Sequence, residues 1–330
     1  MYMFMEVQKM KAFKKTALIS ATIACVLGII IMALAMMMVN FDVKALDLCG
    51  EPQKVTEEFS VDDIESISVS LKNCDIIVKQ SSDDKIRLTY YTTECCPIEL
   101  SHQRQGEISL YDKNNDFEYS MKQFTKGFFH GYAKHGLKTI IEIPSGCENI
   151  EMIIELSNGE INAENLTIKD IDFRTSNGAI TLSEASADVI YMETSNGAID
   201  LSDINCSYKI DANTSNGDIK CSSLNSDEMY LNTSNGKIIL SDIDSKSTLN
   251  TFTSNGDISF KNISAQNIHF DTSNGSISGN IIGKPEDYCI SSGTSNGNDS
   301  LAIYNGKNTS VKNTLKAYTS NGNIIIEFGE

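Results

Sequence analysis

The stretch ETSNGAIDLSDI, residues Glu193–Ile204, contains the unit that this 330-residue chain repeats most. Thr-Ser-Asn-Gly occurs eight times, and a ninth copy has leucine in place of the threonine. The copies stand at 156–159, 175–178, 194–197, 214–217, 233–236, 253–256, 272–275, 294–297 and 319–322. The first six steps between them are 19 or 20 residues long, and the last two are 22 and 25. A near-constant period predicts a repeat architecture, and the longer steps indicate insertions near its end.

Around each copy, apolar residues alternate with polar ones. Isoleucine stands two residues after the glycine in every copy but that at 294–297, which has Asp299 there. In the quoted repeat, Ile199 and Leu201 follow the glycine at alternate positions, and Met192 precedes the threonine by two. Alternation with a period of two, in segments rich in isoleucine, threonine and phenylalanine, is typical of β-strands.

The inward phase of this alternation slips by one residue at Asn196-Gly197. Such a slip sends side chains to the opposite face unless the backbone bends. Glycine adopts positive φ without steric penalty, and asparagine tolerates it better than most residues. We therefore predict a corner at each Asn-Gly, with strand on both sides.

Asn-Gly also favours a two-residue hairpin turn, so an antiparallel meander is the competing interpretation. A meander needs two turns in each repeat, and the segment around LSDI (201–204) is not a hairpin signal. In parallel coils, identical residues stack above one another. We then expect an internal ladder of hydrogen-bonded asparagines, with isoleucine columns filling the interior.

The predicted fold class is all-β, a parallel β-solenoid (β-helix) of about nine 19–20-residue coils with Asn-Gly corners, preceded by one transmembrane helix. The predicted parts are a cytoplasmic tail (1–15), the transmembrane helix (16–40), an irregular β cap with diverged coils (41–150, including an aromatic insertion at 113–137) and the regular solenoid (151–330).

The transmembrane prediction depends on Thr16–Val39, which are 24 residues without a charge. This length suffices for a helix that spans a bilayer. Four lysines precede the run, and Asp42 follows it. The positive-inside rule then places the tail in the cytoplasm and residues 41–330 outside it. Cleavage after Ala35 by a signal peptidase remains an alternative.

Charge is distributed unevenly along the chain. The formal net charge is −17, and residues 1–40 carry four lysines and one glutamate, so −20 falls on residues 41–330. Such a surface repels phosphate backbones, which argues against nucleic acid as a partner.

Residues 41–150 contain three segments that resemble diverged repeats: KNCDIIVKQ (72–80), QGEISLY (105–111) and KTIIEIPSG (138–146). Terminal repeats of a solenoid are expected to be atypical because they cap its end. The insertion at 113–137 is rich in aromatic residues, glycine and lysine. It is either the plug of the open core or a contact site for a partner or membrane surface.

No residue pattern predicts catalysis. Sugar-cleaving sites need converging carboxylates with separated pKa values. Glu184, Asp203 and Asp242 do recur seven residues after the asparagine of the corner. The same column also holds Asn165, Ser223 and Asn262. All six favour turns, so we predict turn chemistry there. We predict no catalytic, cofactor-binding or metal-binding residues, no cofactor, and no enzyme activity.

The nine cysteines lack metal-ligand spacing, and sequence does not decide their disulfide pairing. Cys221 occupies a position where neighbouring repeats have leucine. We expect it to be a small core hydrophobe.

The progression EIPSG (142–146), ELSNGEI (155–161) and TSNGAI (175–180), behind one N-terminal span, resembles the bacterial putative-adhesin family of β-strand-repeat proteins. This resemblance covers about residues 55–330. It implies a parallel β-solenoid in the cell envelope and brings no catalytic residues, because the family is largely a domain of unknown function.

These observations predict a membrane-anchored, extracytoplasmic module for binding, adhesion or scaffolding. Its expected partner is an envelope polymer, a surface ligand or a membrane protein. The alternative is the ectodomain of an envelope-sensing system that signals through a partner membrane protein. A carbohydrate-active enzyme is a distant third.

Overall fold

The computed structural model describes residues 22, 26–30, 34, 37, 52–93, 97–104, 106–113 and 137–329. The chain divides into two compact units, one of residues 1–51 with 115–136 and one of residues 52–114 with 137–330. Among the described residues, no helix is both long and apolar enough to cross a membrane. The predicted tail, most of the predicted span (16–40) and most of the insertion at 113–137 lie outside the described residues.

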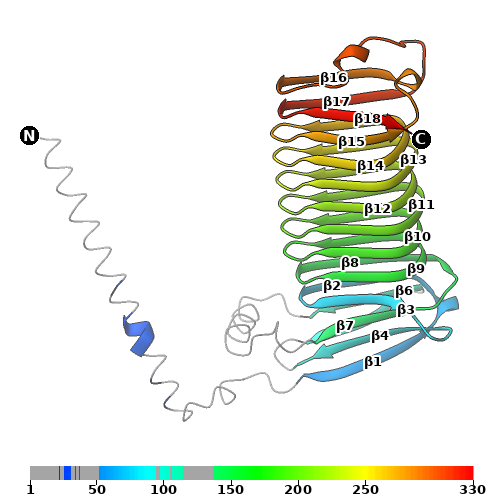
Figure 1. Ribbon diagram of the computed structural model, residues 1–330. Coiled ribbons are helices and arrows are strands. Elements are labelled where there is room, and N and C mark those ends of the chain that lie inside the picture. The colour runs from blue at the N-terminus through cyan, green and yellow to red at the C-terminus, as the bar shows by residue number, and fades with distance from the viewer. Residues whose placement is uncertain are drawn as a thin grey trace, which may run out of the picture. The chain divides into compact units, whose positions relative to one another are not determined.

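The second unit is all-β, and its centre is a stack of six long strands (Figure 1). These are β9 (Ile161–Thr175), β10 (Ile180–Thr194), β11 (Ile199–Thr214), β12 (Ile219–Thr233), β13 (Ile238–Thr253) and β14 (Ile258–Thr272). Each strand pairs in parallel with the next, and equivalent residues of successive repeats lie side by side. The parallel pairing confirms stacked coils and excludes the hairpin meander for these repeats.

The core lies inside the coils. In β10, the buried apolar residues are Ile180, Leu182, Ala185, Ala187, Ile190 and Met192. Their equivalents form continuous columns, such as that of Ile180, which stacks on isoleucine in both neighbouring coils. Each buried side chain of this size contributes about 1.5–3 kcal/mol. The predicted isoleucine columns are therefore confirmed.

Glycine is required at the Thr-Ser-Asn-Gly corner for a reason other than the predicted one. In the eight copies with threonine, the glycine does not adopt a positive φ. Instead, a Cβ on Gly197 would lie 1.7 Å from the carbonyl oxygen of Gly178 in the preceding coil. The same approach, at 1.7 to 2.0 Å, recurs in every one of these copies. The prediction of positive φ at Asn-Gly was therefore wrong for these eight copies. The close approach of neighbouring coils, and not the backbone torsion, accounts for the glycine.

The threonine of the corner links two coils. The hydroxyl of Thr214 donates to the carbonyl oxygen of Gly197 in the preceding coil (2.9 Å) and accepts from the N–H of Gly217 in its own corner (3.2 Å). The threonine is buried in most copies. It satisfies backbone groups that the corner withdraws from the strand ladder and from water.

The asparagines form the predicted ladder. The Nδ2 of Asn196 donates to the Oδ1 of Asn177 (2.7 Å), and Asn216 donates to Asn196 in the same way. The ladder runs through Asn73, Asn158, Asn177, Asn196, Asn216, Asn235, Asn255, Asn274, Asn321 and Asn296. Its predicted internal position was wrong, because Asn196 and the other asparagines of the corners are exposed.

A second bend lies within each long strand. Asn165, Glu184, Asp203, Ser223, Asp242 and Asn262 all have φ between 53° and 56°. This left-handed conformation turns the chain between two straight segments. It confirms the prediction that this column serves turn chemistry.

A register shift accommodates the difference between 19-residue and 20-residue repeats. Ala187 pairs with Cys206, and Val189 pairs with Lys209, so β11 carries one extra residue between these two pairs. The variation in repeat length therefore does not disturb the corner or the core columns.

The N-terminal end of the stack departs from chain order. Its strands are β2 (Ile64–Asn73), β3 (Asp75–Gln80), β6 (Gly106–Asp112), β7 (Lys138–Ile143) and β8 (Cys147–Asn158). The pair β2–β3 lies between β8–β9 on one side and β6–β7 on the other, all in parallel. The three segments that resemble diverged repeats are thus members of the stack. In the chain, residues 113–137 stand between β6 and β7.

Antiparallel strands close this end: β1 (Gln53–Ser60), β4 (Lys85–Thr92) and β5 (Ile98–Arg104), with a short helix η2 (Val61–Asp63) after β1. β4 pairs with β7 and β1 with β4, whereas β5 pairs with β6. Reversing the strand direction stops the repeat, which limits further in-register stacking at this edge.

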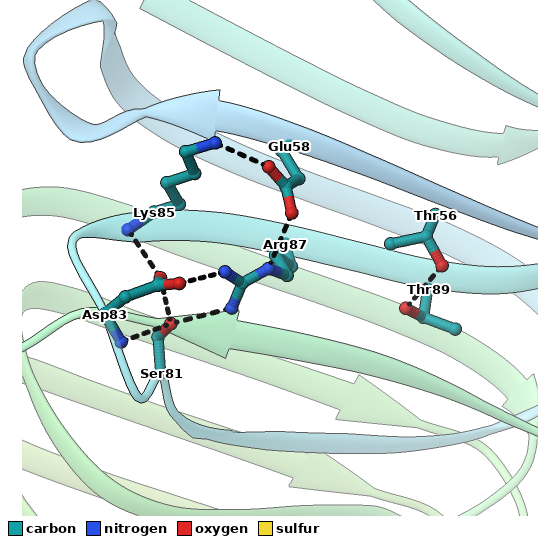
Figure 2. A network of polar contacts seen from close by, with 7 residues as sticks. All are labelled: Thr56, Glu58, Ser81, Asp83, Lys85, Arg87 and Thr89. Carbon is teal, nitrogen blue, oxygen red and sulfur yellow. Dashed lines mark hydrogen bonds and ion pairs between the residues drawn. The ribbon is translucent and has the colours of Figure 1, made fainter.

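A polar network fastens β1 to β4 at this end (Figure 2). Arg87 on β4 donates to Glu58 on β1 (2.9 Å) and to Asp83 in the preceding loop. Lys85 also donates to Glu58 (2.7 Å). Hydrogen bonds from Lys85 and Arg87 lower the pKa of Glu58, and that from Arg87 lowers the pKa of Asp83. Both carboxylates therefore stay charged and hold the antiparallel closure.

The C-terminal end also departs from chain order. It contains β15 (Ile277–Ile282), β16 (Cys289–Asn296), β17 (Thr314–Asn321) and β18 (Ile324–Gly329), with the short helices η4 (Pro285–Asp287) and η5 (Ala302–Tyr304). β17 stacks on β14 and β18 on β15, whereas β16 lies outside β17. Figure 1 shows β17 between β16 and the rest of the stack. The longer last two repeat steps reflect this reordering.

Candidate functional site

One outward face of the stack carries most of the unusual side chains. We call it the pre-corner face and define it by the residues one and three positions before the threonine of each corner. These residues are Asp172, Arg174, Tyr191, Glu193, Asp211, Asn213, Tyr230, Asn232, Asn250, Phe252, His269, Asp271, Ser291, Gly293, Lys316 and Tyr318. Strand register places them in two adjacent columns along the stack. They point outward because the alternate residues of these strands fill the core.

At one end of this face, charged and aromatic groups are paired with one another. Arg174 donates two hydrogen bonds of 2.8 Å to Asp172, and its guanidinium lies 4.7 Å from the ring centre of Tyr191. The hydroxyl of Tyr191 donates to Glu193 (2.8 Å). Burial and this hydrogen bond raise the pKa of Tyr191 to about 12, so its hydroxyl remains a neutral donor. The ring face of Tyr191 is engaged by the cation.

Two coils further along, the pattern repeats. The ammonium of Lys209 lies 2.8 Å from Asp211 and 4.8 Å from the ring centre of Tyr230. The hydroxyl of Tyr230 donates to Glu228 (3.1 Å). Each cluster therefore combines a tyrosine, a cation and a carboxylate, and the two clusters lie two coils apart.

A shallow depression of about 170 Å³ lies along three successive corners of the same face. Its sides are the threonines and serines of three successive corners, together with Glu193, Asn213 and Asn232, and Phe252 closes one end. Asn213 donates to Asp211 (2.7 Å) and Asn232 to Asn213 (2.9 Å), so both amides have fixed orientations. Phe252 is 41% exposed. The depression thus combines amide and hydroxyl groups with an accessible aromatic ring.

Beyond Phe252, the face contains an ionisable pair, His269 and Asp271. Burial lowers the pKa of His269 and raises that of Asp271. Both shifts favour the neutral forms.

The residues weighed as catalytic candidates lie elsewhere. Glu184, Asp203 and Asp242 are exposed at the left-handed bend, on a different part of the coil from the pre-corner face. Within the part of the chain that the structure describes, no three histidine, cysteine, aspartate or glutamate side chains are grouped so that they could hold a metal ion. The prediction of no catalytic, cofactor or metal residues stays a prediction.

Three of the five described cysteines, Cys147, Cys206 and Cys221, are core residues. Cys74, Cys147, Cys206, Cys221 and Cys289 are free thiols, and the other four cysteines lie outside the described residues. Cys221 is 3% exposed, and burial raises the pKa of its thiol strongly. Its predicted role as a small core hydrophobe is confirmed.

Sequence reasoning missed the pre-corner face. A usable signal was present, because aligning the repeats on their threonines places Tyr191, Tyr230 and Phe252 at recurring outward positions. The residues in these two columns differ from repeat to repeat, whereas the corner beside them stays the same. This difference indicates a surface whose residue types the fold does not determine.

Three solved structures are similar to this chain. A putative adhesin from Bacteroides fragilis is 12% identical, covers 83% of this chain and 97% of its own, and superposes with a TM-score of 0.43. A putative lipid binding protein from Parabacteroides distasonis gives 15%, 83%, 97% and 0.43 for the same quantities. A putative cell adhesion protein from Clostridium sporogenes gives 10%, 84%, 100% and 0.29. No curated protein matches the chain. The model of the family Toastrack DUF4097 matches residues 64–327, and the chain belongs to that family.

Proposed function

We propose that this protein is a membrane-anchored, extracytoplasmic β-solenoid of about nine coils that acts as a binding or adhesion module of the bacterial cell envelope. The observation that carries the proposal is the pre-corner face. It offers amides, hydroxyls, carboxylates and an exposed aromatic ring on a rigid parallel scaffold.

The anchor in this proposal is the uncharged run of residues 16–39. The lysines before it favour a cytoplasmic tail, and the acidic remainder of the chain then lies outside the membrane. Protease added to intact cells or spheroplasts should remove the repeats and leave the tail. Protection of residues 41–330 would contradict this topology.

The chemistry of the depression suits a polar, uncharged or cationic polymer. Fixed amides such as Asn213 and Asn232 donate and accept hydrogen bonds, and Phe252 supplies an apolar surface beside them. Ligand sites typically combine a few placed polar groups with aromatic contact. Polyanions such as nucleic acids are disfavoured by the net charge of −20 on residues 41–330. An envelope polymer rich in hydroxyl and amide groups fits best.

The test is co-sedimentation of the full chain, in detergent, with insoluble cell-envelope polymer. We expect the double variant Asn232→Ala/Phe252→Ala to bind at least about tenfold more weakly, because truncating a central aromatic and its polar neighbour removes most binding energy at such sites. Ile239→Ala is the matched control, because Ile239 is 40% exposed but lies outside the pre-corner face. Equal binding by all three proteins would refute this face as the site. Capture of one membrane protein instead of polymer, abolished by the same double variant, would favour the envelope-sensing function.

A further inference from the structure

The last two strands of the chain fill a layer inside the stack. We call residues 314–329, which contain β17 and β18, the C-terminal segment. β17 pairs with β14 on one edge and with β16 on the other. β18 pairs with β15, and residues 299–300 contact its other edge through a bridge and hydrogen bonds.

The C-terminal segment completes both the core and the corner at this level. Leu315, Ala317 and Ile324 are fully buried. Thr319 donates to the carbonyl oxygen of Gly275 (2.8 Å), and Thr294 donates to that of Gly322 (2.8 Å). The asparagine ladder also passes through the segment, from Asn274 to Asn321 and on to Asn296.

Without the segment, the layer between β14–β15 and β16 would expose two strand edges that face each other across one strand width. Such edges are templates for another strand, because their backbone N–H and C=O groups lack partners. The layer also specifies which strand fits. It requires apolar side chains at alternate positions, followed by a threonine-serine-asparagine-glycine corner.

The connection between β16 and the C-terminal segment permits the segment to leave and return. It comprises residues 297–313, 17 residues of which Leu301 alone is buried. An extended chain of that length reaches about 56 Å. This reach is ample for the segment to enter a neighbouring molecule instead of its own.

We propose that the layer between β14–β15 and β16 is a strand-acceptor site, and that the C-terminal segment of a second copy of this chain occupies it when two copies are held close together. The second copy is the fitting occupant because it supplies the same apolar residues and the same corner. Exchange of an identical element is a low-cost route to a dimer, since the pairing and packing that one copy gives up internally form again between the two copies. This inference does not depend on the proposed ligand face.

The first experiment probes the acceptor with a fluorescent synthetic peptide of residues 312–330. The full-length double variant Leu315→Asp/Ile324→Asp should release its own segment, because two carboxylates would otherwise be buried without partners. We expect this variant to bind the peptide at least about tenfold more tightly than the native chain does, since the tethered native segment competes at high effective concentration.

Two controls make this result specific. The full-length variant Lys316→Asp/Ile325→Asp changes the outward residues of the same strands and should bind no more peptide than the native chain. A peptide with Leu315→Asp and Ile324→Asp should not bind to the displaced variant. If the displaced variant keeps its β-type circular dichroism spectrum and does not bind the native peptide, the acceptor site is refuted.

The second experiment tests the second copy directly. Two differently tagged native chains are mixed at high concentration, diluted, and captured through one tag. We expect mixed dimers, and we expect their loss in the full-length variant Ser291→Cys/Lys316→Cys, whose register pair would lock β17 to β16 by a disulfide. Reductant should restore exchange. Absence of mixed dimers in the native chain at every concentration would overturn the proposed second copy, even if the peptide binds; this experiment also decides the matter if the displaced variant does not fold.

Discussion

Each repeat of this protein turns its chain at two well-defined bends that work by different physics. At the Thr-Ser-Asn-Gly corner, the backbone torsions of the glycine are ordinary, and its missing Cβ lets successive coils approach. At the left-handed bend, φ is between 53° and 56°, and the residue is asparagine, glutamate, aspartate or serine. A constraint between coils fixes a sequence, because every coil must fit its neighbours. A local torsion requires only a tolerant residue, so its sequence varies.

The largest expected effect is at the corner. In Gly217→Ala, the new Cβ would lie 1.7 Å from the carbonyl oxygen of Gly197 and 2.4 Å from its carbon. Because backbone atoms of both coils must move, we expect the free energy of unfolding to fall by about 3–5 kcal/mol. Thermal or urea unfolding followed by circular dichroism measures it. Gly293→Ala is the control, because its Cβ would meet only Tyr318, at 3.7 Å. Equal effects of the two substitutions would show that close stacking does not select glycine.

This first comparison also shows what sequence could predict. The period, the strand alternation and the isoleucine columns follow from residues such as Ile180 and Ile199, which recur at fixed positions. They could be predicted because a stack repeats the same environment. The reason for Gly217 could not be predicted, since a glycine that avoids a clash between coils and a glycine that adopts positive φ look identical in a sequence.

The ends of the stack were less predictable. Strand order there depends on which free edge the chain reaches, and β17 inserts between β14 and β16 although β16 precedes it in the chain. The Thr-Ser-Asn-Gly sequence at 319–322 is the same as in the other copies, so it does not indicate where its strand lies in the stack. The pre-corner face was missed for a related reason, because the residue types at its outward positions, such as Tyr230 and Phe252, differ from coil to coil.

A second, smaller effect concerns the hydroxyl of the corner. Thr214→Val keeps the shape of the side chain but removes the partner of the Gly197 carbonyl and of the Gly217 N–H. We expect a loss of about 1–3 kcal/mol in the free energy of unfolding. Thr251→Val is the matched control, because the hydroxyl of Thr251 is buried in the core and has no hydrogen-bond partner among the described residues. We expect that substitution to raise the melting temperature. If Thr251→Val lowered the free energy of unfolding as much as Thr214→Val does, the hydrogen bonds of the Thr214 hydroxyl would not account for the loss.

A third effect tests the asparagine ladder. Asn196→Asp replaces a donor with a carboxylate that cannot donate to the Oδ1 of Asn177, and Asn196→Leu removes both bonds. Because Asn196 is exposed, water replaces part of each bond, and we expect only about 0.5–1.5 kcal/mol for either change. Asn323, which directly follows the corner at 319–322, is not a bond-free control, since its Oδ1 accepts from the N–H of Asn298 (2.9 Å). Melting of Asn323→Leu should therefore show a measurable fall. No shift in either Asn196 variant would mean that the ladder does not stabilise the stack.

The smallest effects on the free energy of unfolding are expected at the left-handed bend. Whether a substitution there raises or lowers stability distinguishes this bend from the corner. Ser223 has φ of 56°, a conformation that disfavours residues with a Cβ and disfavours β-branched residues most. Serine already carries the penalty of a Cβ, so Ser223→Val should lower the free energy of unfolding by only about 1 kcal/mol. Ser222→Val, one residue earlier in the regular ladder, should change it by less than about 0.5 kcal/mol, because valine suits a strand.

Ser223→Gly completes the argument. Glycine relieves the torsional strain but adds freedom to the unfolded chain, so we expect a gain of at most about 1 kcal/mol. Introducing glycine at the left-handed bend would then leave stability unchanged or raise it. Replacing the glycine of the Thr-Ser-Asn-Gly corner with alanine, in contrast, would lower stability strongly. Urea unfolding of Ser223→Gly, Ser223→Val and Ser222→Val measures all three under the same conditions. If Ser223→Val destabilises the protein no more than Ser222→Val does, torsion does not set this bend, and contacts between coils must govern both bends of the repeat.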